Sequence, residues 1–367
     1  MPSEYSAPTI DDMLKLSTIP GIASARIRML LNEFGNADAV CSASIRRLTA
    51  MRGIDRELAR QISKGYDQHI IDFQHEWLRR EDTGIIPLWD KNYPPMLKAC
   101  PDAPLFLFYR GKVPEHWPAI LGIVGTRRPT NYGRKTTARF TEELVRRNIS
   151  IASGFARGID TIAHQTCVDQ GGKTIAILGC GLDCIYPPEN KNLFDTMLES
   201  HLLLSEYLFG TGPDAMNFPK RNRIISGLSR GVIIIEAGRK SGTLITANYA
   251  LEQNREVFSV PGNIDSPVSL GTNELIQQGA KLIASIEDIF DELPTLPGKE
   301  VATERPLPEN LDAREKLLLQ LLGNQQLHID HLVKELEEAP ASILSRLLKL
   351  ELRNLVRQKP GKIFMRN

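Results

Sequence analysis

The chain has 367 residues, of which 42% are hydrophobic, and its 45 lysines and arginines almost balance its 44 aspartates and glutamates. A formal net charge of +1 excludes a protein that binds polyanions over its whole surface, but it leaves room for a local basic site. No apolar run approaches the roughly 20 residues that span a bilayer, and the N-terminus lacks a basic segment followed by an apolar one. Five cysteines without a CxxC pair fit a reducing compartment. We therefore expect a cytoplasmic protein with no membrane partner and no metal.

Residues 1–82 are predicted to form a helical domain. The segments "IPGIASARI" and "MRGIDRELA" each place a glycine before an amphipathic helix. This pattern is typical of a helix-hairpin-helix unit, in which backbone N–H groups face a phosphate. The first segment matches better, and Arg26, Arg28 and Arg52 are the cations expected beside such a unit. An ordinary structural pair of helical hairpins is an equally open interpretation.

Residues 83–292 show a different pattern. Short apolar runs such as "AILGIVG", "KTIAILG" and "GVIIIEA" alternate with amphipathic stretches. Continuous apolar strands of this kind are typical of a parallel sheet covered by helices on both faces. With right-handed crossovers they predict an α/β domain, Rossmann-like and doubly wound, with a mostly parallel sheet. Its beginning, residues 87–118, is rich in proline and aromatic residues and is expected to be a connecting segment packed against the sheet.

The remaining sequence is predicted to contain a linker and a small domain. Residues 293–311 form a proline-rich linker. Residues 312–367 suggest three helices, a turn at Pro360-Gly361 and a short strand, which is the order of a winged helix. The segment "APASILSRLLKLELRN" takes the position of its recognition helix but is short of arginine and lysine for a strong DNA reader. A DNA contact and a protein contact both stay open for it.

Ligands of a doubly wound sheet bind beyond the carboxyl ends of its strands. All the loops predicted there contain glycine or serine, and several contain arginine. Glycine lets the backbone approach a ligand closely, helix N-termini present free N–H groups, and arginine adds charge and forked donors. The pattern therefore predicts an anion site where the loops meet. These loops are residues 125–134, 153–160, 179–190, 205–223, 236–247 and 260–263.

The stretch "NFPKRNRIISGLSR" places four cations, Lys220, Arg221, Arg223 and Arg230, ahead of a predicted buried strand. In a nearly neutral chain, such a cluster indicates that phosphates arrive at this edge of the sheet.

Enzymatic functions find little support in the pattern. "GCGLDC" begins like a dinucleotide-binding fingerprint but ends in Cys184, and no P-loop occurs. His164 lies inside an amphipathic helix, where a packed histidine is expected. Glu206 and Glu236 end strands, where they could hold loops by accepting N–H bonds or could act as an acid–base pair. No catalytic residue and no cofactor are assigned.

Six motifs follow one another within residues 119–290: "VGTRRPTNYG", "SGFARGIDTIAHQ", "ILGCGLDCIYPPENKNL", "SEYLFGT", "FPKRNRIISGLS" and "IEAGRKSGTLITANYALEQNREVFSVPG". In this order they resemble the DprA/Smf family of DNA-processing proteins. The resemblance implies a SAM-like helical domain, a Rossmann-like domain and a winged helix. It implies a protein that is not an enzyme, binds single-stranded DNA without sequence preference, protects it and loads the RecA recombinase onto it during natural transformation. It also implies a homodimer.

The resemblance carries a set of binding residues onto this chain. Arg127 is the first expected phosphate clamp, and Pro188 stands where the family often has a lysine, with Arg128 or Lys191 as the expected substitute. Tyr132, Phe155, Tyr186 and Phe218 are candidate platforms for base stacking, although loop packing is an alternative for each. The phosphate-binding set is Gly125, Thr126, Arg127, Arg128, Ser153, Gly154, Gly179, Gly181, Phe218, Lys220, Arg221, Asn222, Arg223, Ser241, Gly242 and Thr243.

Protein contacts are also implied. A dimer seam is expected at Leu275, Ile276 and Leu282, and the surface around Leu251 is a candidate contact for RecA. Two other functions stay open. One is a nucleotide-binding or nucleotide-hydrolysing enzyme of the related Rossmann superfamily, whose "PGGxGT" loop corresponds to "AGRKSGT" here. The other is a scaffold in which the flanking domains bind DNA while the central domain only dimerises.

Overall fold

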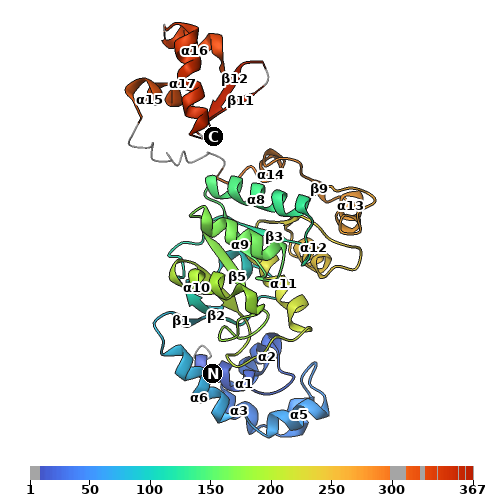
Figure 1. Cartoon of the computed structure of the whole chain (residues 1–367). Helices are drawn as coiled ribbons and strands as arrows, with labels where there is room; N and C mark the ends of the chain where they lie inside the picture. Colours follow the sequence, from blue (N-terminus) through green and yellow to red (C-terminus); the bar gives the residue numbers. More distant parts are fainter. Residues whose placement is uncertain are drawn as a thin grey trace. The chain divides into compact units, whose positions relative to one another are not determined.

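The computed structural model describes residues 9–297, 311–322, 327–336, 338–353, 355–359 and 361–366. The chain divides into two compact units between residues 301 and 302 (Figure 1). Within the described residues, no helix is long and apolar enough to cross a membrane.

The first unit is built on a nine-stranded sheet with the order β1-β2-β6-β5-β4-β3-β7-β8-β9. All strands from β3 to β9 run parallel to one another. β1 and β2 pair antiparallel and extend the sheet beyond β6. This confirms the predicted doubly wound, mostly parallel sheet. The strands are β1 (Thr83–Pro87), β2 (Phe106–Gly111), β3 (Ile120–Val124), β4 (Ser150–Ser153), β5 (Thr174–Ile177), β6 (Leu202–Ser205), β7 (Gly231–Ile234), β8 (Glu256–Ser259) and β9 (Lys281–Leu282).

Helices cover both faces of the sheet because its strands are apolar on both sides. Ala152 packs into the core beneath α11 and α12, while its neighbour Ile151 packs into the core beneath α8 and α9. Thr130 caps α8 by accepting the Gly133 N–H at 3.1 Å. The helices of this region are α7 (Pro95–Lys98), α8 (Asn131–Arg146), α9 (Ile159–Asp169), η1 (Pro188–Asn190), α10 (Lys191–Ser200), α11 (Asn217–Leu228), α12 (Gly242–Glu252), α13 (Leu270–Gln277) and α14 (Glu287–Glu292).

The N-terminal helices, predicted as a separate domain, share a core with the edge of the sheet. Buried residues of α1 and α2, such as Leu14 and Leu30, belong to the same apolar cluster as Phe106, Phe108 and Phe209. The two regions therefore fold as one compact unit. The six helices are α1 (Ile10–Ser17), α2 (Ser24–Phe34), α3 (Ala37–Cys41), α4 (Ile45–Thr49), α5 (Arg56–Ser63) and α6 (Gln68–Leu78).

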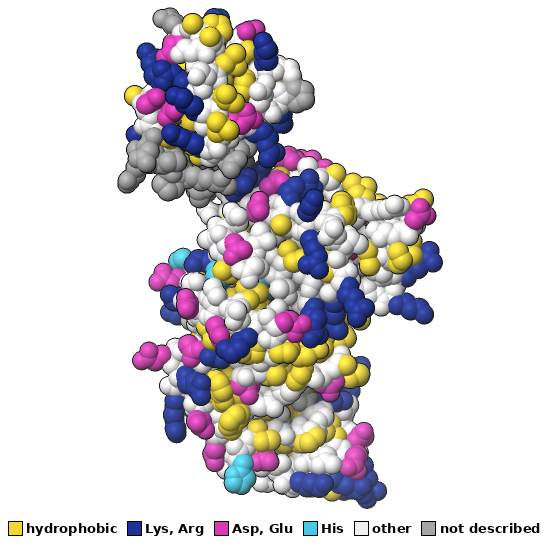
Figure 2. Space-filling model, viewed as in Figure 1, with side chains coloured by type: hydrophobic (Ala, Val, Ile, Leu, Met, Phe, Trp, Pro, Cys, Tyr) yellow, Lys and Arg dark blue, Asp and Glu magenta, His cyan; other side chains and the backbone are white. Residues whose placement is uncertain are grey.

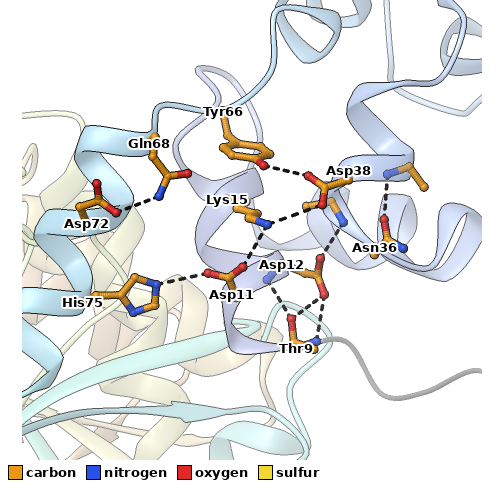
Figure 3. Close-up of polar contacts among 12 residues, drawn as sticks. Thr9, Asp11, Asp12, Lys15, Asn36, Asp38, Tyr66, Gln68, Asp72 and His75 are labelled. Carbon is orange, nitrogen blue, oxygen red and sulfur yellow. Dashed lines mark hydrogen bonds and ion pairs between the residues drawn. The ribbon is translucent and has the colours of Figure 1, made fainter.

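Polar contacts hold these helices together at their surface (Figure 3). Lys15 of α1 lies 3.1 Å from Asp11 and 3.7 Å from Asp38 of α3. Asp38 also accepts a hydrogen bond from the Tyr66 hydroxyl at 2.8 Å, and Asp11 lies 3.2 Å from His75 of α6. The network joins α1, α3, α6 and the loop before α6. These surface contacts add to the apolar core beneath the helices.

The second unit has the predicted winged-helix order, with a three-stranded antiparallel sheet in the order β10-β12-β11. Its core includes Leu318, Leu332, Ile343, Leu347 and Phe364. The predicted turn residue Gly361 has φ +84°, whereas Pro360 lies outside the described residues. The elements are α15 (Ala313–Leu322), β10 (Leu327–His328), α16 (Ile329–Leu336), α17 (Pro340–Leu352), β11 (Val356–Lys359) and β12 (Ile363–Arg366).

Candidate nucleic-acid interface

The loops that follow the parallel strands converge at the carboxyl edge of the sheet. The Thr126 N–H, after β3, donates to the Glu236 carbonyl, after β7, at 2.8 Å. The Ile159 N–H, after β4, donates to the Thr126 carbonyl at 3.2 Å. The Asn222 amide of α11 donates to the Gly242 carbonyl at 3.4 Å. Four of the predicted anion-binding segments thus meet through direct contacts.

A pocket opens where these loops meet. Its rim carries exposed Arg127 and Arg157 beside two aromatic rings. The Arg127 guanidinium lies 5.7 Å from the Phe218 ring centre, and Arg157 lies 5.7 Å from that of Tyr186. The two rings are 5.4 Å apart and tilted by 34°. The pocket is lined by Arg127, Gly154, Ala156, Arg157, Leu178, Gly179, Tyr186, Pro187 and Phe218.

Two glycines allow the loops to approach so closely. Gly158 has φ +81°, and a Cβ there would overlap the backbone of Thr126 and Arg127. A Cβ on Gly179 would lie 2.8 Å from the Phe218 ring. Any side chain at these positions would push the Arg127 loop or the Phe218 ring away from the pocket.

Arg221 does not lie at the surface, contrary to the prediction that it binds phosphate. The segment "FPKRNR" forms the first turns of α11, so helical periodicity turns Arg221 inward with Ile224 and Ile225, and it is 3% exposed. Its Nη1 donates to the carbonyls of Gly154, at 2.6 Å, and Ile177. Arg221 therefore joins the ends of β4 and β5 from beneath the pocket.

Asp160 is the buried anion opposite this arginine. Its carboxylate accepts the Gly154 and Ala156 N–H groups at 3.1 and 3.4 Å. Burial raises the pKa of Asp160 to about 6, although Arg221 and the two N–H groups act in the opposite direction. Burial likewise lowers the pKa of Arg221 to about 10, against the attraction of Asp160. The pair fixes the loop after β4, which supplies the pocket wall.

The raised pKa of Asp160 predicts a pH-dependent stability difference. The native state binds this proton more tightly than the unfolded chain does, so protonation of Asp160 adds to the free energy of unfolding. This stabilisation is fully present below about pH 4 and is lost as the pH rises through 6. Asp160→Asn cannot titrate there. The free energy of unfolding of the wild type minus that of Asp160→Asn should fall by about 2–3 kcal/mol between pH 4 and pH 7.5. Urea unfolding at both pH values measures it, and a constant difference would contradict the prediction.

Arg223 is also committed to other protein groups. It pairs with Glu206 and lies 3.9 Å from Asp102, and its side chain is 15% exposed. Glu206 additionally accepts a hydrogen bond from the Ser24 hydroxyl at 2.7 Å. Arg223 thus ties α11 to neighbouring segments, and the structure does not offer it to a ligand as the sequence suggested.

Glu236 holds the Arg127 loop. Its carboxylate accepts the Thr130 N–H at 3.0 Å and the Thr130 hydroxyl at 2.5 Å, and the residue is 2% exposed. Of the two open interpretations for the strand-ending carboxylates, the contacts of Glu206 and Glu236 therefore match loop holding. His164 is fully buried, with Nδ1 2.7 Å from the Thr174 hydroxyl, and burial lowers its pKa to about 3. It packs as a neutral residue.

The other predicted phosphate-binding residues divide into exposed and buried groups. Arg128, Lys220 and Gly242 are exposed, and Gly125, Thr126, Asn222 and Ser241 are partly exposed. The Ser241 hydroxyl caps α12 by accepting the Thr243 N–H at 3.2 Å. The buried ones contribute backbone or packing only: these are Ser153, Gly154, Gly179, Gly181 and Thr243.

The aromatic candidates also separate. Phe155 is fully buried and packs against Phe194, so it cannot stack on a base. Tyr132 is 49% exposed but lies in a different hollow, where its hydroxyl donates to the Pro261 carbonyl at 2.9 Å. Tyr186 and Phe218 are the two aromatic residues of the pocket itself.

The sequence analysis missed Arg157. Its guanidinium pairs with Glu189, which follows the position where the family often has a lysine, and this contact lowers the pKa of Glu189. Arg157 therefore supplies a cation beside the loop in which Pro188 stands in place of the family's lysine. The signal was present, since Arg157 lies within the motif "SGFARGID", but nothing in the pattern separated it from a solvated surface arginine.

Arg230 lies apart from the other cations of its segment. It precedes β7, and its N–H donates to the carbonyl of Ile120, the first residue of β3. It therefore sits at the amino edge of the sheet, opposite the pocket.

Figure 2 shows lysine and arginine side chains gathered over the region of α11 and α12, beside an apolar band.

The predicted dimer seam needs a correction. Leu275 is 6% exposed and belongs to the core beneath α12, so it cannot also form a seam. Ile276 is partly buried, and Leu282 is 43% exposed. Leu251 of α12, suggested as a contact for RecA, is 60% exposed. Leu275 faces inward because α13 packs against β8 at the end of the sheet.

The recognition helix α17 exposes leucines where a DNA reader would carry polar groups. Leu348 and Leu352, one turn apart, are 58% and 79% exposed. Arg346 is held by Asp312 at 3.0 Å. This surface favours a protein contact over the DNA contact that the sequence left open.

Among the described residues, no group of three His, Cys, Asp or Glu side chains could hold a metal ion.

Comparison with known proteins identifies relatives over most of the chain. Residues 84–294 match the family model of DNA recombination-mediator protein A, and residues 302–362 match the DprA winged helix domain. Protein Smf of Synechocystis is 33% identical, covering 96% of this chain and 98% of its own length. DNA processing protein DprA of Bacillus subtilis is 48% identical over 217 residues, which are 59% of this chain and 73% of that protein.

Solved structures of DprA proteins are also similar to this chain. DprA of Streptococcus pneumoniae superposes with a TM-score of 0.67 and 35% identity, covering 77% of this chain and 98% of that one. A structure titled for the single-stranded DNA binding mode of DprA from Helicobacter pylori gives a TM-score of 0.52 and 31% identity, covering 58% of this chain and 96% of that one. Because one family model spans more than half of the chain and full-length relatives agree with it, the chain belongs to the DprA/Smf family of DNA recombination-mediator proteins.

Proposed function

We propose that the chain binds single-stranded DNA, without sequence preference, in the pocket beneath Arg127. The observation that carries this proposal is the pocket itself, in which two exposed arginines stand beside two aromatic rings over a glycine-lined floor. Phosphates would be held by guanidinium groups and backbone N–H groups, and bases would stack on Tyr186 or Phe218. Lys220, exposed two residues after Phe218 on α11, adds a further cation.

The proposal extends to what the bound strand is for. In this proposal the protein protects incoming single strands and loads the RecA recombinase onto them, as a homodimer in the cytoplasm. The family description as a recombination mediator and the single-strand binding named for the Helicobacter pylori relative support it. The binding function is assigned to residues 83–292, with residues 293–311 as linker and 312–367 as the winged helix. The exposed leucines of α17 suit a protein contact.

We also propose that the chain is not an enzyme. Glu206 and Glu236 are occupied by Arg223 and Thr130, and His164 is fully buried against the Thr174 hydroxyl. Release of free base from nucleoside monophosphates would instead favour the nucleotide-hydrolysing alternative.

Binding of the purified chain to oligo-dT and to a duplex of equal length tests the proposal. Affinity for oligo-dT should be at least tenfold higher and should fall steeply with salt, because each phosphate contact adds about −0.7 to the slope of log K against log salt for single strands. Fluorescence anisotropy at several salt concentrations measures both. Equal affinity for the two DNAs, or no dependence on salt, would contradict a single-strand pocket.

A further inference from the structure

The second helical hairpin near the N-terminus carries a concentration of positive charge that the pocket does not explain. Residues 44–64 contain six cations and two acids, in a chain with a net charge of only +1. All six cations are exposed. Figure 2 shows lysine and arginine side chains gathered over α5, at the far end of the first unit from α8. We call this the second-hairpin surface, formed by Arg46, Arg47, Arg52, Arg56, Arg60 and Lys64.

Four of these cations, three arginines and Lys64, have no carboxylate partner within residues 9–297. Arg47 lies 3.2 Å from Glu33, and Arg60 lies 3.6 Å from Glu57. The remaining acid of the segment, Asp55, is used to cap α5, where it accepts the Leu58 N–H at 2.8 Å. Within residues 9–297, no carboxylate pairs with the other three arginines. These are Arg46, Arg52 and Arg56.

The turn between α4 and α5 is held in a fixed shape. Gly53 at its tip has φ +79°, is exposed, and has nothing within 4 Å of the position of a Cβ. Arg26 of α2 donates to the Gly53 carbonyl at 3.1 Å and to the Gly21 carbonyl of the first hairpin at 2.8 Å. One side chain therefore joins the two turns and leaves the approach to Gly53 open.

The first hairpin, the better match in sequence, is closed off by the sheet. The Ser24 hydroxyl at the start of α2 donates to Glu206 at 2.7 Å, which places a carboxylate where a phosphate would have to bind. Arg28 donates to the Ala103 carbonyl at 3.3 Å. Of the three arginines expected beside the hairpins, only Arg52 therefore points to a free surface.

The chemistry of the second-hairpin surface fits the backbone of a duplex. Residues 44–64 contain no aromatic residue, so this surface has no ring of its own on which a base could stack. A single strand gains affinity from base stacking, whereas a duplex presents stacked bases and regularly spaced phosphates to forked guanidinium donors. We propose that the second-hairpin surface is a second nucleic-acid site, which binds the phosphate backbone of duplex DNA independently of the pocket.

Neutralising the three unpaired arginines tests this proposal in the full chain. Arg46→Gln, Arg52→Gln and Arg56→Gln together should weaken binding of a fluorescein-labelled 30-base-pair duplex at least tenfold. The slope of log K against log salt should become shallower by about 2.7, since each duplex phosphate contact contributes about −0.9. Affinity for oligo-dT should stay within twofold of wild type, because the pocket is untouched. Unfolding by urea should not change, since all three side chains are exposed.

A matched variant removes the same charge elsewhere in the first unit. Lys91→Gln, Lys98→Gln and Lys112→Gln are also exposed and should leave duplex binding within twofold of wild type. Unchanged duplex affinity in the arginine variant would overturn the proposal, as would an equal loss for both triple variants. If the arginine variant lost oligo-dT and duplex to the same extent, the surface would belong to the single-strand site instead. Failure of the pocket proposal would appear separately, as weak oligo-dT binding by the wild type.

Discussion

Removing the side chains of Arg127 and Lys220 together is expected to lower affinity for oligo-dT at least a hundredfold. Both residues are exposed, and within residues 9–297 neither has a carboxylate partner that would have to be displaced by a phosphate. A charge-assisted hydrogen bond contributes about 1.5–3 kcal/mol, so two such contacts account for the expected loss. The slope of log K against log salt should become shallower by about 1.4, as two contacts are lost. Anisotropy titrations with Arg127→Ala/Lys220→Ala measure both quantities.

The opposite edge of the sheet provides the control. Lys173 and Arg230 are also exposed, but they precede β5 and β7 and lie at the amino ends of these strands. Lys173→Ala/Arg230→Ala removes the same two residue types and should bind oligo-dT within twofold of wild type. If the Arg127/Lys220 variant bound as tightly as wild type, the pocket would not be the binding site. If both double variants lost equal affinity, a general effect of charge would explain the result.

The parallel part of the sheet could be predicted because its strands are short, mostly apolar runs separated by amphipathic stretches. β3, β5 and β7 fall within the predicted runs "AILGIVG", "KTIAILG" and "GVIIIEA". β1 and β2, the antiparallel edge pair, did not stand out. β1 is a five-residue run at the boundary between two predicted domains, and prolines and aromatic residues in residues 87–118 conceal β2. The helical region gave no sign that it shares a core with this edge, because that core is made by contacts such as those of Phe209, far away in sequence.

The candidate site was predictable as a set of loops but not as a set of side-chain directions. Arg127 and Phe218 lie at the pocket, together with the backbone of Gly154 and Gly179. A motif such as "FPKRNR" does not say whether it is a loop or a helix, and here a single helical turn sends Lys220 to solvent and Arg221 into the core. Counting cations therefore overstated the charge available to a ligand.

The same limit applies to the protein contacts. An apolar helix such as α13 has a buried side and an exposed side, and its sequence does not say which one faces a partner. Leu275 proved to be core, while Leu282, on β9, is exposed. The dimer itself stays a prediction, and its seam would have to use exposed residues.

Replacing Arg221 is expected to destabilise the fold rather than to remove a DNA contact directly. Arg221→Met would leave the carbonyls of Gly154 and Ile177 without a donor and Asp160 without its cation. Removing the cation that faces a buried carboxylate should cost about 3–5 kcal/mol, because the carboxylate then stays buried and uncompensated. Urea unfolding at pH 7.5 should therefore show a large loss of free energy of unfolding. Lys220→Ala, one residue away but exposed, should change it by no more than about 0.5 kcal/mol.

A double-mutant cycle separates the electrostatic interaction of Arg221 with Asp160 from the hydrogen bonds that Arg221 donates to the two carbonyls. Because Asn carries no charge to be left unpaired, Asp160→Asn should cost less in the Arg221→Met background than in wild type, and the two effects should not add. What remains in the double variant is the loss at the two carbonyls, which hold the ends of β4 and β5 under the pocket. Two neighbouring cations of one motif would then act in separate ways, Lys220 on DNA affinity and Arg221 on stability. Arg221→Met with wild-type stability, or additive effects in the cycle, would contradict this division.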